Sequence, residues 1–150
     1  MTSYYTAAIL SAAMLVPAAC APSGPGAQDM AACTAMLTGD ADIEADLTEY
    51  GSSVEGYCDC YVTTLAEKGE TTQATVRKVV STIVSLREDR GLGLEEAAGL
   101  IEEEAEGRTQ EQTFGISEAE LEIAGQLVDG VRRDLRDNEG QCSVAVNEEG

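Results

Sequence analysis

Apolar residues recur every three or four positions through most of the chain after residue 50, and this spacing predicts amphipathic α-helices. The longest such segment runs from Thr71 to Arg90. Its apolar positions share one helical face: Val76, Val79, Val80, Ile83, Val84 and Leu86. After a Gly-Leu-Gly turn, residues 94–107 repeat the pattern, with Leu94, Ala97, Ala98 and Ile101 on one face and the glutamates on the other. Each segment therefore has a face that must be buried against a partner.

Two further helices are marked by capping signals at their starts. Ser117 is followed three residues later by Glu120, which is the spacing of a reciprocal capping box, and Gly140 is placed to end this helix. Ser52 and Glu55 have the same spacing and predict the start of an earlier helix.

The segment between residues 30 and 49 has a weaker pattern. It predicts a short helix over residues 30–37 and a second over residues 43–49. No segment alternates apolar and polar residues as a β-strand does. We therefore expect an all-α fold, a small array of four or five helices tied by disulfides, in one domain spanning residues 30–150.

The first residues have the character of a bacterial export signal. From Ala7 to Val16 the chain reads AAILSAAMLV, which is about half the length that a helix needs to span a bilayer. We expect residues 1–19 to be a signal peptide. Residues 20–29 are rich in proline, glycine and alanine and predict a flexible tether.

The end of this leader resembles the lipobox of bacterial lipoproteins. The residues that carry the resemblance are Pro17, Ala18, Ala19 and Cys20. It implies a lipid on Cys20 and attachment of the mature chain in the cell envelope, in the periplasm or at the outer membrane. Pro17 stands where an aliphatic residue is usual, and an ordinary secretory leader with a secreted product is the alternative. The mature part is also loosely similar to short exported bacterial proteins with a Cys-x-Cys pair in a helical context, a resemblance that implies no activity.

The formal net charge of -19 limits the partners. The first basic residue is Lys68, so the N-terminal half has no cation to offset its acidic groups. This charge argues against nucleic acid as a partner and against an anionic membrane surface. We expect contact with the membrane only through the N-terminal lipid, and a basic protein is the partner class that the charge favours.

The chain contains no histidine, which excludes histidine-based triads and histidine-ligated zinc or haem. Asp40, Asp42 and Glu44 begin like a calcium loop, but Ala45 occupies the position of the tight-turn glycine. The glutamates at 102–104 and 106 have the pattern of a solvated helix face. We assign no catalytic residue, no metal ligand and no cofactor.

Four cysteines other than Cys20 form an even set: Cys33, Cys58, Cys60 and Cys142. Because residues two apart on a helix point about 200° apart, Cys58 and Cys60 are poor partners for each other. Two pairings are left: Cys33 with Cys58 plus Cys60 with Cys142, or Cys33 with Cys60 plus Cys58 with Cys142.

Structural disulfides are the first interpretation of these cysteines in an oxidising compartment. The alternative is a thiol-redox or metal-handling site at Cys58 and Cys60, with Cys33 and Cys142 completing four sulfurs. The sequence as a whole favours an exported, lipid-anchored acidic helical protein that acts as a non-enzymatic binding or support module.

Overall fold

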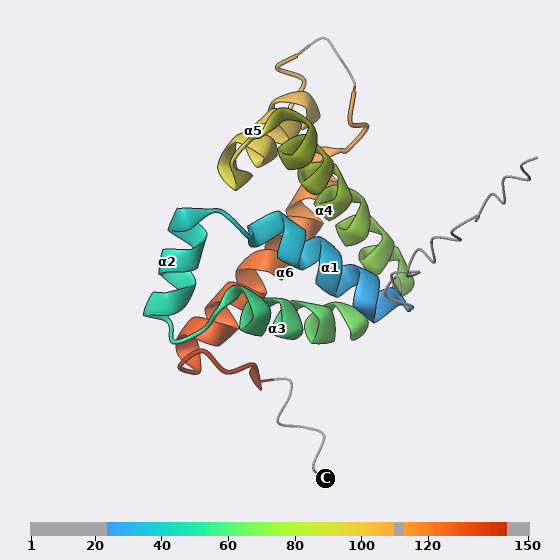
Figure 1. Cartoon of the computed structure of the whole chain (residues 1–150). Coiled ribbons are helices and arrows are strands. Elements are labelled where there is room, and N and C mark those ends of the chain that lie inside the picture. Colours follow the sequence, from blue (N-terminus) through green and yellow to red (C-terminus); the bar gives the residue numbers. More distant parts are fainter. Residues whose placement is uncertain (1–23, 110–112, 144–150) are drawn as a thin grey trace, which may run out of the picture.

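A computed structural model describes residues 24–109 and 113–143 (Figure 1). These residues form six helices and no strands: α1 (Pro25–Leu37), α2 (Ala41–Glu49), α3 (Val54–Ala66), α4 (Glu70–Arg90), α5 (Leu94–Ala105) and α6 (Glu118–Asp137). The expected all-α fold is confirmed. Among these helices, none combines the length and the apolar character required to cross a membrane.

Four of the helices form a closed ring of contacts. α1 packs against α3 and α4, and α6 packs against the same two helices from the other side. α5 lies over α4 and α6, while α2 contacts α3. The expected array had four or five helices, and the count among the described residues is six because both weakly patterned N-terminal segments form helices, α1 and α2.

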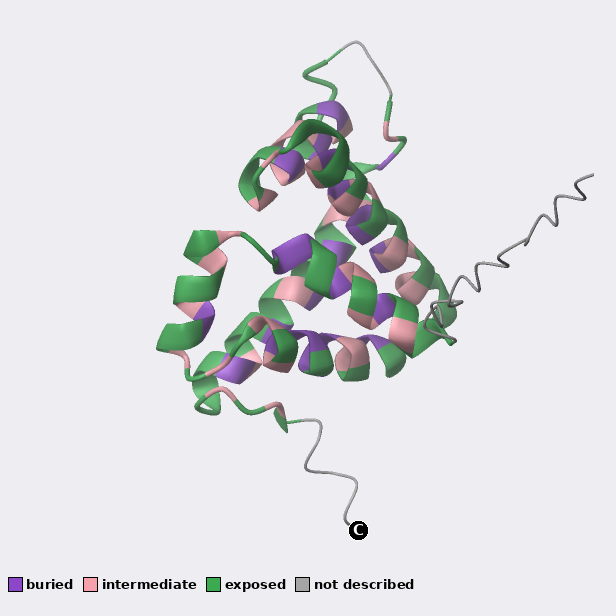
Figure 2. Cartoon of the chain, in the orientation of Figure 1, coloured by how far each residue is buried: buried purple, intermediate pink, exposed green. Residues whose placement is uncertain are grey.

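The core lies inside the ring, where the buried positions of each helix face one another (Figure 2). It is built mainly from aliphatic residues with two tyrosines; among its fully buried members are Tyr61, Leu65, Val76, Ile101, Val131 and Leu135. The apolar faces expected from the sequence are therefore the faces that pack.

α1 begins earlier than the sequence pattern predicts. It starts at Pro25, so residues 25–29 are helical and do not belong to the expected tether. Proline suits this position because its ring fixes a helical φ and its missing N–H has no partner in the first turn. The extra turn buries Asp29, whose two carboxylate oxygens accept hydrogen bonds from Arg77 on α4, each at 2.8 Å.

The two expected capping boxes have different outcomes. At α6, Ser117 Oγ accepts from the Glu120 N–H and a Glu120 oxygen accepts from the Ser117 N–H, as predicted. At α3 the prediction was one residue off, because Ser53 is the N-cap and accepts from the Gly56 N–H. The Ser52 hydroxyl is instead buried without a hydrogen-bond partner among the described residues.

The structure contains the first of the two cysteine pairings. Cys33 is bonded to Cys58 and Cys60 to Cys142, with Cα–Cα distances of 5.7 and 5.3 Å. Cys58 and Cys60 point to different neighbours, as helical geometry requires. Both are nevertheless buried, because α1 packs on one side of α3 and α6 on the other. Cys20 and the leader lie outside the described residues.

Candidate functional site

An apolar pocket of about 300 Å³ lies where α5 packs over α4 and α6. Nearly all of its lining is aliphatic: Met36 from α1; Val79, Val80 and Ile83 from α4; Leu94 and Ala98 from α5; Leu121, Ala124, Gly125 and Val128 from α6. Glu102 is the one charged residue of this lining. Such a pocket favours an apolar group, and its polar edge sets the orientation of what enters.

A second hollow of about 230 Å³ lies beside the pocket and shares Glu102 and Leu121 with it. The carboxylates of this hollow, which we call the acidic rim, are Glu102, Glu106, Glu118 and Glu122. Arg108 is an ion-pair partner of two of them, 2.6 Å from Glu106 and 3.9 Å from Glu102. The rim keeps a net negative charge beside an apolar interior.

The N-terminal end of α5 is held by Asp40. One carboxylate oxygen of Asp40 accepts from the Leu94 N–H at 3.1 Å, and the other accepts from the Ile43 N–H at 3.3 Å. The hydrogen bond from Leu94 is the main reason that the pKa of Asp40 lies below its usual value, against the opposing effect of burial. One ionised side chain thus caps both α2 and α5.

Arg87 joins the same corner of the molecule. Its guanidinium donates to the carbonyls of Ala35, Met36 and Thr38 at the end of α1, and to the Leu92 carbonyl in the turn before α5. These carbonyls are the ones that a helix end leaves without internal partners. Arg87 therefore fixes α1, which supplies Met36 to the pocket, relative to α5.

The C-terminal end of α5 is held by Glu104. Its carboxylate accepts three backbone N–H groups, from Thr113 at 2.6 Å, Phe114 at 2.7 Å and Gly115 at 2.9 Å. Burial raises the pKa of Glu104, but the three hydrogen bonds outweigh burial and the pKa is lowered. The acidic run was expected to be a solvated face, and this is wrong for Glu104, which is buried.

Lys78 connects α4 to the start of α6. Its ammonium group donates to the Gly115 carbonyl at 2.6 Å and to Glu120 at 2.8 Å. The hydrogen bond from Lys78, with those from Ser117, lowers the pKa of Glu120 to about 2. Charged side chains thus link α4 to α5 through Arg87 and α4 to the start of α6 through Lys78.

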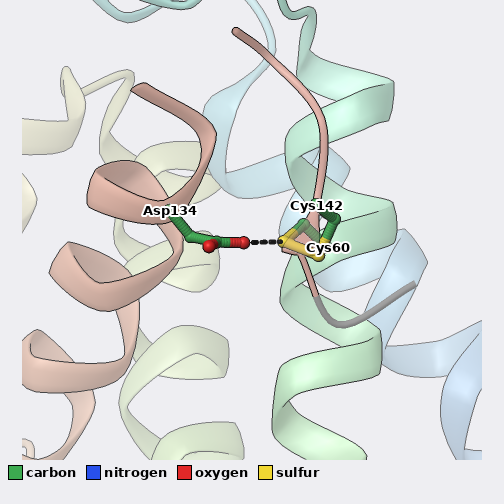
Figure 3. Close-up of side chains that lie close together, drawn as sticks. All are labelled: Cys60, Asp134 and Cys142. Carbon is green, nitrogen blue, oxygen red and sulfur yellow. Dashed lines mark hydrogen bonds between the residues drawn. A yellow bond between two sulfur atoms is a disulfide. The ribbon is translucent and has the colours of Figure 1, made fainter. Parts of the chain in front are cut away.

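A second cluster lies near the C-terminal end of α6. Cys60 from α3, Asp134 from α6 and Cys142 from the segment after α6 place their sulfur and carboxylate atoms within 4.8 Å of one another (Figure 3). A carboxylate oxygen of Asp134 is 3.7 Å from Cys60 Sγ. Cys33 and Cys58 are bonded to each other and do not belong to this cluster, so the described residues do not gather the four sulfurs considered from the sequence.

Sequence reasoning found some of these residues and missed others. The pocket lining was identified only as apolar helix faces, since nothing in the chain shows that α5 leaves a gap against α4 and α6. Glu104 did carry a signal, because it follows Ala97 and Ile101 at helical spacing on the buried face. Asp134 carried none, as it is one acid among many.

Comparison with known proteins leaves this geometry as the basis for any functional assignment. No protein-family model, curated protein or solved structure matches the chain.

Proposed function

We propose that this protein is an acidic, non-enzymatic binding module of the bacterial cell envelope that holds a cationic amphipathic segment of a partner protein. The observation that supports this function is the apolar pocket between α4, α5 and α6 with the acidic rim at its edge. A helical segment with leucine-like residues on one face and lysine or arginine beside them matches both parts of the surface.

Charge selects the partner class. The chain carries 28 acidic and 9 basic residues, so its field attracts cations from a distance and raises their rate of association. The acidic rim then provides charged contacts next to the pocket. In the pocket itself, apolar side chains of the partner are buried away from water. Affinity comes mainly from the pocket, and selection against neutral or acidic segments comes from the rim.

The test is binding of a fluorescent amphipathic helical peptide of leucine and lysine, followed by anisotropy. Gly125→Leu places a side chain in the pocket, while Gly130→Leu makes the same change on α6 outside it. A Cβ at either position meets no atom within 4 Å, and both changes raise helix propensity. We expect Gly125→Leu to weaken binding at least tenfold and Gly130→Leu to change it less than twofold.

The rim is tested separately. Glu118→Gln with Glu122→Gln removes two rim charges, and Asp59→Asn with Glu67→Gln removes two exposed charges, one from α3 and one from its C-cap. We expect the rim pair to weaken binding at low salt and to reduce its salt dependence, with the α3 pair having a much smaller effect. Equal effects of both pairs, together with equal effects of Gly125→Leu and Gly130→Leu, would show general charge attraction and contradict the proposal.

The location rests on the leader and on Cys20. We infer export by residues 1–19 and attachment to the envelope through a lipid on Cys20, with the acidic domain held away from the membrane surface. Intact mass of the protein recovered from a bacterial envelope tests this directly. A diacylglyceryl or triacyl mass on Cys20 that is lost in Cys20→Ser supports the anchor, whereas an unlipidated secreted chain contradicts it.

A redox or metal function is the second candidate. With both disulfides formed, Cys58 and Cys60 belong to different bonds and do not act on each other. The observation that favours a metal function is that Cys60, Cys142 and Asp134 lie close together.

A further inference from the structure

We propose that reduction of the Cys60–Cys142 disulfide creates a zinc-binding site made of the two thiolates and the Asp134 carboxylate. The three side chains come from α3, α6 and the segment that follows α6, and they point toward one another (Figure 3). This inference does not depend on the pocket and concerns the opposite end of α6.

The two disulfides differ in access. Cys33 and Cys58 have no exposed surface, whereas Cys142 is only partly buried. A reductant must bring its own thiolate to a disulfide sulfur, so the Cys60–Cys142 bond reacts first. The Cys33–Cys58 bond stays closed and keeps α1 on α3.

The reduction balances with a dithiol as the reductant. One of its thiolates attacks Cys142 Sγ, the bond to Cys60 breaks, and Cys60 leaves as a thiolate. The second thiolate of the reductant then displaces Cys142, so that two electrons pass to the protein and the reductant becomes a disulfide. The two protons of the dithiol reach the protein thiols and are released again when zinc binds.

The segment that carries Cys142 is held in place without the disulfide. Asp134 accepts from the Ser143 N–H at 2.8 Å and from the Ser143 hydroxyl at 2.6 Å, and the Gly140 N–H donates to the Leu135 carbonyl at 2.8 Å. Cys142 therefore stays beside Cys60 after reduction. A site whose ligands are already positioned binds a metal at a smaller ordering cost.

The donor set fits zinc. Two thiolates and one carboxylate are three of the four ligands of a tetrahedral zinc ion, and water can supply the fourth. Without a cation, two thiolates beside a carboxylate repel one another, and a divalent ion removes that repulsion. A purely sulfur-binding ion such as Cu(I) makes no use of Asp134. Since each carboxylate oxygen has two lone pairs, Asp134 can bind the ion and keep Ser143 as a partner that orients it.

The experiment uses the full chain, treated with dithiothreitol and freed of it without air. Alkylation and mass mapping identify which bond has opened, circular dichroism reports the helices, and titration of zinc against a chromophoric chelator gives stoichiometry and affinity. We expect one zinc per reduced chain, none in the oxidised chain, and an unchanged helical signal. Cobalt(II) in place of zinc should give thiolate charge-transfer bands.

Two variants separate a site from general attraction of cations. Asp134→Asn should lower zinc affinity at least tenfold, while Asp137→Asn, an equal charge change at an exposed position of α6, should lower it less than twofold. Cys60→Ser with Cys142→Ser should abolish binding. Prior opening of Cys33–Cys58, loss of the helices on reduction, absence of zinc binding, or equal effects of the two aspartate changes would each overturn the proposal.

Discussion

At the scale of single residues, Gly140 is the position where the backbone leaves least room. Its φ is +82°, and a Cβ there would lie 3.0 Å from the Ser52 nitrogen and closer still to the Gly51 carbonyl. The segment after α6 thus passes directly against the turn between α2 and α3. Only glycine meets both conditions, because it has no Cβ and accepts positive φ.

Replacement of Gly140 by alanine should therefore destabilise the protein by about 2 kcal/mol or more, from left-handed backbone strain plus displacement of the turn. Gly130→Ala is the matched control on α6, where a Cβ meets no atom within 4 Å. It should stabilise the protein by about 0.5–1 kcal/mol, because alanine favours the helix. Urea unfolding followed by circular dichroism measures both. Equal stability of the two variants would contradict the close approach at Gly140.

At the scale of helices, the start of α6 depends on an ionised side chain. Glu120 accepts from the Ser117 N–H, the Ser117 hydroxyl and Lys78, and its pKa falls from a usual 4.5 to about 2. A carboxylate whose pKa is lowered by folding stabilises the folded state fully above its unfolded pKa. This stabilisation is lost as the pH falls from 4.5 toward 2.

Glu120→Gln should accordingly reduce the free energy of unfolding most at neutral pH, and its difference from the natural chain should narrow through this acid range. Glu118→Gln changes the same charge two residues earlier, at an exposed position, and should have a much smaller effect at neutral pH. Urea titrations repeated at a series of pH values follow the difference. A gap that stays constant with pH would mean that the charge of Glu120 is not what holds the cap.

The helices also show which parts of the fold could be predicted from local sequence patterns. The α6 capping box and the apolar face of α4 were predictable, because each depends on residues within a few positions. The start of α3 was placed one residue early, since Ser52 and Ser53 both have capping side chains and the sequence does not distinguish them. The extra turn of α1 from Pro25 carries Asp29, which pairs with Arg77, 48 residues away, and no local pattern shows such a contact.

The candidate site was less predictable than the fold. Helical geometry separated Cys58 from Cys60 and left two pairings, but the choice required the positions of α1 and of the segment after α6. α5 is held at both ends, by Asp40 and Glu104, and an apolar pocket remains where it packs over α4 and α6. Such a gap is a property of tertiary packing and has no signature in one segment.

At the scale of the whole molecule, the excess of acidic groups opposes folding. A compact chain of net charge -19 brings like charges together, and salt screens their repulsion. We expect the free energy of unfolding at neutral pH to rise with sodium chloride, and the rise to shrink as the pH approaches the isoelectric point near 4.1. Urea unfolding across salt and pH measures this. A fall in stability with salt at neutral pH would show that the ion pairs outweigh the repulsion.

The two disulfides close neighbouring loops, residues 33–58 and 60–142, with Asp59 alone between them. The backbone and the two disulfides thus form two closed covalent loops that are joined at residues 58–60, in the middle of α3. A protease that cuts one peptide bond inside either loop therefore releases no fragment, because the disulfide that closes the loop still joins the two pieces. Residues 106–109, which follow α5, are exposed and lie in the larger loop, so a single cut there would leave the protein one covalent unit.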